Sequence, residues 1–114
     1  MNAFSDVLDT LVTDEGVPRP HARDVFHELN QMGHEVYLWS SAGGAYAAAA
    51  AETLGVRDLV AGCFDKRREP EVPVDFAVDD ASFTGSRGGH RVKPFGGDAH
   101  DEALPRVVEA VEAS

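Results

Sequence analysis

Short apolar runs with strand character alternate along this chain with longer segments whose apolar residues recur at helical spacing. Strand-like runs cover residues 3–8, 36–39, 59–64, 76–78 and 90–95, and helical spacing appears over residues 22–32, 41–54 and 101–111. Strands that alternate with helices form a parallel sheet joined by right-handed crossovers. We therefore predict a single α/β domain over residues 1–114, a three-layer sandwich with a parallel, Rossmann-like sheet.

Capping residues predict where the helices begin and end. Ser40 or Ser41 would cap the start of the second helix, and Gly55 would end it in a left-handed conformation. Asp101 would cap the third helix, where Pro105 is tolerated only in the first turn.

The charge of the chain limits its partners. Its 20 acidic and 10 basic residues give a net charge of −10, which repels the backbone of nucleic acids unless basic residues are concentrated locally. The only dense basic run, residues 66–68, is followed directly by Glu69 and Glu71. Nucleic acid is therefore an unfavourable ligand.

Neither a membrane anchor nor a disulfide is expected. The longest apolar run, Ala45–Ala51, is far shorter than a membrane span, and no secretory signal pattern opens the chain. Cys63 is the only cysteine, which excludes an internal disulfide and an all-cysteine zinc site. These features predict a cytoplasmic protein.

Polar residues follow four of the predicted strands at the point where each strand ends. They are Asp6 and Asp9 after the first strand, Ser40 after the second, Lys66 after the third, and Asp79 with Asp80 after the fourth. The carboxyl ends of parallel strands meet at one edge of the sheet, where ligands bind. A carboxylate nucleophile, carboxylate ligands for Mg²⁺ and a lysine together favour phosphoryl transfer through an aspartyl-phosphate.

Four motifs in this order resemble those of the haloacid dehalogenase (HAD) superfamily, and the resemblance covers nearly the whole chain. The matching pieces are residues 4–11 (FSDVLDTL), residues 36–40 (VYLWS), Lys66 and residues 75–80 (DFAVDD). The resemblance implies a HAD-type sheet and a Mg²⁺-dependent phosphohydrolase, which acts on a phosphorylated substrate.

The same resemblance implies a role for each site residue. Asp6 would be both the nucleophile and a Mg²⁺ ligand. The carbonyl oxygen of Leu8, with Asp79 or Asp80 or both, would complete the protein ligands of the metal.

Two further residues would act on the phosphoryl group. Ser40 would donate a hydrogen bond to a phosphoryl oxygen. Lys66 would hold the nucleophile and offset negative charge in the transition state, and Arg67 is the alternative residue for this role.

Two positions depart from the family pattern. HAD phosphatases carry an Asp two residues after the nucleophile that protonates the leaving group, and Leu8 stands at that place. Asp9 replaces the Gly that follows in the motif; it is the candidate to substitute as the acid, one residue out of register. Loss of a general acid costs about 10²–10⁴-fold in rate, and it matters least where the leaving group is already good.

The segments where the family inserts a cap domain are short. Residues 11–19 leave room for no more than a flap, and residues 65–74 form only a loop, so the chain resembles a capless member. An open site of this kind suggests a macromolecular substrate or closure by a partner subunit. We interpret the glycine-rich residues 82–89 as a flap beside the site.

Two functions remain open from the sequence. Asp6, Ser40 and the Asp79–Asp80 pair favour the phosphohydrolase. Leu8 and Asp9 favour a catalytically degenerate HAD-fold module that binds a metal, phosphate or a protein partner. Oligomeric state carries no sequence signal.

Overall fold

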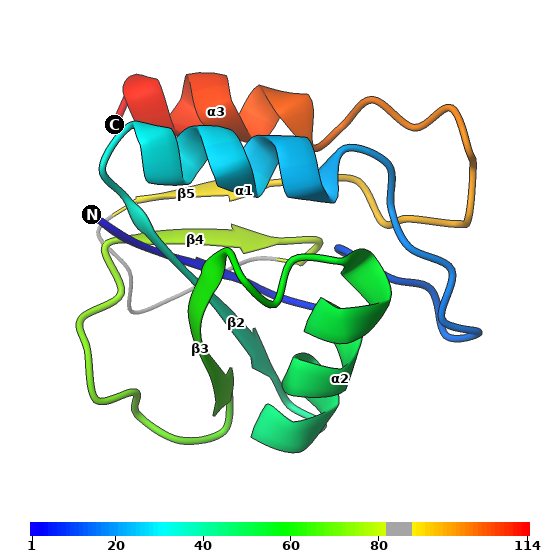
Figure 1. The fold of residues 1–114 in the computed structure, drawn as a ribbon, viewed down its shortest axis with the longest axis horizontal. Coiled ribbons are helices and arrows are strands. Elements are labelled where there is room, and N and C mark those ends of the chain that lie inside the picture. The colour runs from blue at the N-terminus through cyan, green and yellow to red at the C-terminus, as the bar shows by residue number, and fades with distance from the viewer. Residues whose placement is uncertain (82–87) are drawn as a thin grey trace.

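A computed structural model describes residues 1–81 and 88–114, which form five strands and three helices (Figure 1). The strands are β1 (Asn2–Ser5), β2 (Glu35–Ser40), β3 (Val60–Asp65), β4 (Phe76–Asp79) and β5 (Gly89–Arg91). The helices are α1 (Ala22–Gln31), α2 (Gly44–Leu54) and α3 (Pro105–Glu112). Within the described residues no helix is long and apolar enough to cross a membrane.

The five strands form one sheet in the order β3-β2-β1-β4-β5, and every neighbouring pair is parallel. This arrangement confirms the predicted Rossmann-like α/β fold. The chain moves from β1 outward to β2 and β3, and then returns to the other side of β1 to form β4. The switch of direction places the carboxyl ends of β1 and β4 side by side, which is where ligands bind in open parallel sheets.

One face of the sheet carries all three described helices. Side chains from β1, β2 and β4 on this face share a core with the buried residues of α1, α2 and α3. Figure 1 shows α1 and α3 side by side along this face, and the two helices are in contact. The crossovers through α1 and α2 lead in the same direction along the sheet, so a right-handed connection puts both helices on the same face.

The opposite face is aromatic and has a different cover. Phe4 and Trp39 are buried there, and the ring of Phe4 stacks on Tyr37 at a centroid distance of 4.8 Å. Val72 and Val74 pack against this cluster. They belong to the connection between β3 and β4, which is a loop. The second helical layer expected of a three-layer sandwich is therefore replaced by a loop on this part of the sheet.

Several predicted boundaries differ from the structure. The first strand ends at Ser5 rather than at residue 8, and the fifth covers residues 89–91 rather than 90–95. Gly43, with φ of 106°, is the N-cap of α2, while the Ser40 hydroxyl accepts a hydrogen bond from the Ala42 amide. Gly55 ends α2 in the left-handed conformation, as predicted. Most of the predicted flap, residues 82–87, lies outside the described residues.

The prediction that Asp101 caps the third helix is wrong, because Asp101 lies in the segment before the N-cap residue. There it accepts a hydrogen bond of 3.0 Å from the Ala103 amide and pairs with a buried arginine. The Arg19 side chain is fully buried and donates hydrogen bonds of 2.8 and 3.1 Å to the two carboxylate oxygens of Asp101. Its third hydrogen bond, of 3.1 Å, goes to the carbonyl oxygen of Thr10. The pair joins the loop after β1 to the segment before α3, and Leu104 takes the N-cap position.

Candidate metal centre

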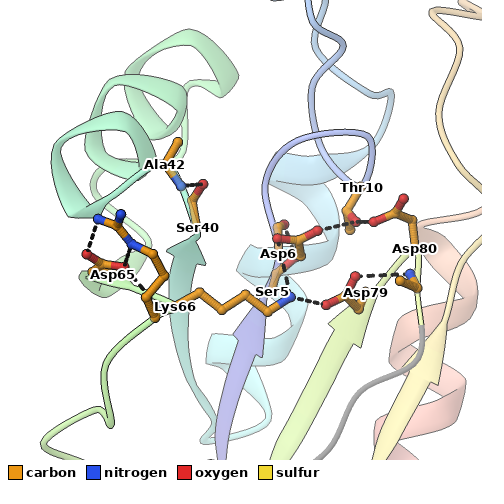
Figure 2. A network of polar contacts seen from close by, with 11 residues as sticks. Ser5, Asp6, Thr10, Ser40, Ala42, Asp65, Lys66, Asp79 and Asp80 are labelled. Atoms are coloured by element: carbon orange, nitrogen blue, oxygen red, sulfur yellow. Dashed lines mark hydrogen bonds and ion pairs between the residues drawn. The ribbon is translucent and has the colours of Figure 1, made fainter.

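The candidate site begins where β1 ends. The amide of Asp6 donates a hydrogen bond of 2.8 Å to the carbonyl oxygen of Val78, which extends the β1–β4 pairing by one residue. The chain then turns, and the carboxylate of Asp6 lies beside the residues that follow β4 (Figure 2). The parallel register thus places the ends of two distant segments next to each other.

Three carboxylates meet at this edge. Oxygen atoms of Asp6, Asp79 and Asp80, one from each residue, lie within 4.8 Å of one another. Asp79 is buried, whereas Asp6 and Asp80 are half-buried. Hard divalent cations prefer oxygen ligands of this kind, so these three residues form a possible metal site.

Lys66 supplies the positive charge at the cluster. Its Nζ donates a hydrogen bond to Asp79 and lies 3.6 Å from the nearer oxygen of Asp6. Figure 2 shows its side chain extending across the end of the sheet toward these carboxylates. The alternative residue, Arg67, instead forms an exposed ion pair with Asp65, at 2.7 Å. Of the two candidates, only Lys66 contacts the cluster.

Thr10 contacts the cluster, although the sequence did not single it out. Its hydroxyl lies 3.3 Å from a carboxylate oxygen of Asp6 and 3.1 Å from one of Asp80. A hydroxyl has a single proton, so it donates to one carboxylate at a time. Two signals were available: its position in the turn after the predicted nucleophile, and its place within residues 4–11, the first of the matched motifs.

Burial and neighbouring groups shift the pKa values of two of the acids. Burial and the charge of Asp79 raise the pKa of Asp6 to about 7, and the nearby Lys66 offsets only part of this effect. Burial alone would raise the pKa of Asp79. However, hydrogen bonds from Lys66 Nζ and from the Ala81 amide outweigh the effect of burial, and the pKa of Asp79 is lowered. A bound cation would favour the ionised form of both acids.

Leu8 and Asp9 occupy the turn after Asp6. The Leu8 side chain is 40% exposed and has no proton to donate. Asp9 has φ of 63°, in the left-handed region that Gly adopts most easily and Asp tolerates. Within the described part of the chain, no hydrogen bond joins the Asp9 carboxylate to the three acids.

Ser40 lies at the same edge but bonds within its own turn. It is buried at the end of β2, and its hydroxyl accepts a hydrogen bond of 3.1 Å from the Ala42 amide (Figure 2). Its carbonyl oxygen accepts a hydrogen bond from the Lys66 amide. Among the described residues, no hydrogen bond connects the Ser40 hydroxyl to the acidic cluster.

Tyr46, like Thr10, was not singled out in the sequence, which predicted only that residue 46 lies in a helix. It is half-buried in the first turn of α2. Burial raises the pKa of its phenol, and the charges of Asp14, Asp6 and Asp9 raise it further. Its proximity to these acids results from the packing of α2 on the sheet.

No known protein family, curated protein or solved structure matches the chain. The chemistry of the site is therefore argued from its own residues: an acidic triad able to hold a metal ion, at the carboxyl edge of a parallel, Rossmann-like sheet.

Proposed function

We propose that this protein is a Mg²⁺-dependent phosphohydrolase of the HAD type, which acts through an aspartyl-phosphate on Asp6. One observation carries the proposal. Asp6, Lys66 and the Asp79–Asp80 pair lie at the carboxyl ends of three different strands and form one cluster at that edge of the sheet. Their order along the chain is the order of the motifs that resemble the HAD superfamily.

The donor set fits a magnesium ion. Asp6, Asp79 and Asp80 offer carboxylate oxygens, and the carbonyl oxygen of Leu8 accepts no hydrogen bond from the described residues. Mg²⁺ prefers oxygen ligands and keeps several water molecules, so two or three carboxylates suffice. When bound, the metal would neutralise charge on the phosphoryl group.

The side chains of the site have separable tasks in the proposed reaction. An Asp6 carboxylate oxygen attacks phosphorus, the bond to the ester oxygen breaks, and the leaving group departs with its electron pair. Water then hydrolyses the acyl phosphate, which releases inorganic phosphate and restores Asp6. Lys66 holds Asp6 and Asp79 in position and offsets charge. The Ser40 oxygen can keep the hydrogen bond that it accepts from the Ala42 amide, because that bond does not use the hydroxyl proton, which would be donated to a phosphoryl oxygen.

Proton donation to the leaving group is the weak step. Leu8 has no proton to give, and Asp9 is the neighbouring carboxyl group that would take over the role. The rate should therefore depend steeply on the acidity of the leaving group. Aryl and acyl phosphates should turn over, and simple alkyl phosphates should barely react.

The absence of a proton donor at Leu8 favours a second candidate function. A HAD-fold module without a general acid could bind a metal ion, phosphate or a protein partner without turnover. Such a module would keep the acidic triad and lose the catalytic cycle. The two candidates differ in one measurable property, which is turnover of an activated ester.

The experiment compares turnover of an activated aryl phosphate in the presence of Mg²⁺ by the native chain, Asp6→Asn and the matched control Asp24→Asn. Asp24 is an exposed acid in the first turn of α1. Loss of a nucleophile typically costs more than about 10³-fold, so Asp6→Asn should be nearly inactive and Asp24→Asn should equal the native chain. Equal rates for the native chain and Asp6→Asn would favour the binding module.

A further inference from the structure

A second polar site lies next to the acidic triad. A cleft of about 370 Å³ opens between β5 and the first turn of α3. Its charged and polar lining consists of His90, Arg91, Lys93, Glu102 and Arg106. The carboxyl edge of the sheet carries β5 beside β4, so the cleft and the triad share that edge.

The cleft concentrates positive charge in an acidic protein. Three of the 10 basic residues of the chain line it, although the net charge is −10. Within the described residues, neither Arg91 nor Arg106 has a carboxylate oxygen within 4.0 Å. The one acid in the lining, Glu102, faces His21 at 3.2 Å. The two arginines therefore have charge and hydrogen-bond donors available for a ligand.

The walls of the cleft come from two elements that face each other. His90 of β5 and Arg106 of α3 line the same cleft, and the two elements are in contact. Burial and the positive charge of Arg106 lower the pKa of His90. A guanidinium group and a neutral imidazole together offer several N–H donors. Planar guanidinium groups bind carboxylate and phosphate oxygens in a bidentate manner.

Arg91 connects the cleft to the triad. It pairs with Asp79 in the β4–β5 register, and its Nε donates a hydrogen bond of 3.3 Å to the carbonyl oxygen of Asp80. The Val92 amide donates a hydrogen bond of 2.9 Å to the carbonyl oxygen of Asp79. A ligand group in the cleft thus lies beside the backbone that positions two of the three acids.

We propose that this cleft binds a second anionic group of the substrate, a carboxylate or a phosphate, while the phosphoryl group that reacts lies at the acidic triad. The inference rests on the proposed function, and it specifies the substrate class as a phosphate ester that carries another anion. It also gives the net-negative protein a local means of holding a polyanionic molecule.

Anion binding is tested first without divalent cations, so that the acidic triad repels the probe. Inorganic phosphate and malonate are titrated into the protein in EDTA, and backbone amide shifts are followed by NMR. Saturable shifts should appear at residues 89–93 and 102–106, and the tighter of the two probes indicates the chemistry of the anion. Absence of saturable shifts there for both probes overturns the inference.

Substitutions in the cleft test which residues are responsible for anion binding. Arg91→Ala combined with Arg106→Ala should weaken binding about tenfold, since two ionic contacts are lost. Arg57→Ala, at an exposed arginine before β3, should bind as the native chain does. Lys93→Gln provides a second test if the double variant does not fold. Lys93 is 72% exposed and its Nζ lies 4.0 Å from Asp101, so the neutral Gln removes the positive charge without placing a carboxylate against that buried acid. Undiminished binding in a folded double variant or in Lys93→Gln overturns the inference.

Turnover separates this inference from the proposed function. With Mg²⁺, the ratio of kcat/KM for 4-carboxyphenyl phosphate to that for 4-carbamoylphenyl phosphate is compared between the native chain and the double arginine variant. The ratio should fall several-fold in the variant through KM, and leaving-group effects cancel. An unchanged ratio overturns the cleft as a substrate site and leaves the phosphohydrolase intact. No turnover of either ester overturns the phosphohydrolase, and with it the substrate role of the cleft, even where the titration shows anion binding.

Discussion

The chain buries charge in two places, and the two places are built differently. Arg19 and Asp101 form a matched pair, with two hydrogen bonds between them and a third from Arg19 to the carbonyl oxygen of Thr10. The pair is almost completely buried and spans 82 positions in the sequence. Each charge has a partner, so the pair is a structural link.

The acidic triad has no such balance. Three carboxylates share one ammonium group, that of Lys66, which hydrogen-bonds only to Asp79 and lies 3.6 Å from Asp6. Charge that is partly buried and not neutralised by the protein costs free energy unless a ligand neutralises it. The comparison teaches that a matched buried pair can link two segments without leaving net charge, whereas surplus buried charge indicates a site for a cation.

The two clusters are joined through one residue. The carbonyl oxygen of Thr10 accepts from Arg19, and its hydroxyl contacts Asp6 and Asp80. The Arg19–Asp101 pair therefore also positions Thr10, a residue that contacts the acidic triad. Substitutions in the pair and in the triad can be compared directly, because both change the free energy of unfolding.

Breaking the matched pair should have the largest effect. Arg19→Met leaves the Asp101 carboxylate buried without its partner and should reduce the free energy of unfolding by about 3–5 kcal/mol. Adding Asp101→Leu to Arg19→Met should recover most of this loss, because no unpaired charge remains. Urea unfolding of both variants measures the effect. A double variant no more stable than Arg19→Met would show that the pair does more than balance charge.

Filling the triad should stabilise the protein by a smaller amount. Mg²⁺ at about 100 times its dissociation constant should raise the free energy of unfolding by about 2.7 kcal/mol through mass action. Thermal unfolding with and without Mg²⁺ measures this effect, and Asp79→Asn with Asp80→Asn should remove most of it. Arg19→Met should respond to Mg²⁺ as the native chain does if its triad is intact. A full Mg²⁺ response in the double Asn variant would place the ion elsewhere.

Removing one carboxylate from the acidic triad should raise the free energy of unfolding, whereas breaking the Arg19–Asp101 pair lowers it. At pH 8 in EDTA, Asp6→Asn should be more stable than the native chain by about 1 kcal/mol, because a charged carboxylate is no longer buried and its repulsion from Asp79 is relieved. Chemical unfolding measures the difference, and added Mg²⁺ should reverse its sign. Destabilisation in EDTA would mean that the Lys66 and Thr10 contacts outweigh the repulsion.

The smallest expected effect is the pH dependence of the stability that the Arg19–Asp101 pair contributes. Hydrogen bonds from Arg19 lower the pKa of Asp101, so the pair contributes its full stability above the unfolded pKa of about 3.9 and loses it as the pH falls through the lower folded value. The stability difference between the native chain and Arg19→Met/Asp101→Leu should be constant from about pH 5 to 8. It should change only below about pH 4, as urea unfolding across this range would show. A difference that changes between pH 5 and 8 would argue against Asp101 as the titrating group.

The sequence by itself determined the class of fold and the edge at which the acids meet. Alternating strand and helix signals imply a parallel sheet, and parallel strands end at a common edge, so Asp6 and the Asp79–Asp80 pair had to lie at the same edge. Their contact also required β1 and β4 to be neighbours, which the strand order of the folded sheet decides. The role of Gly55 at the end of α2 was also predictable from the sequence, because a helix end depends on local conformation. These predictions needed only the order of residues along the chain and the geometry of strands and helices.

Only the tertiary structure decided which side chains meet. The pairing of Arg19 with Asp101, the choice of Lys66 over Arg67, and the contact of Thr10 with two acids depend on distances between segments far apart in sequence. The cover of the aromatic face is also a tertiary result, because the β3–β4 connection crosses the sheet as a loop that packs two valines on Phe4 and its neighbours. Local patterns specify backbone conformation and which face is apolar. The partner of a charged side chain depends instead on where the packed chain leaves space and opposite charge, which no local pattern encodes.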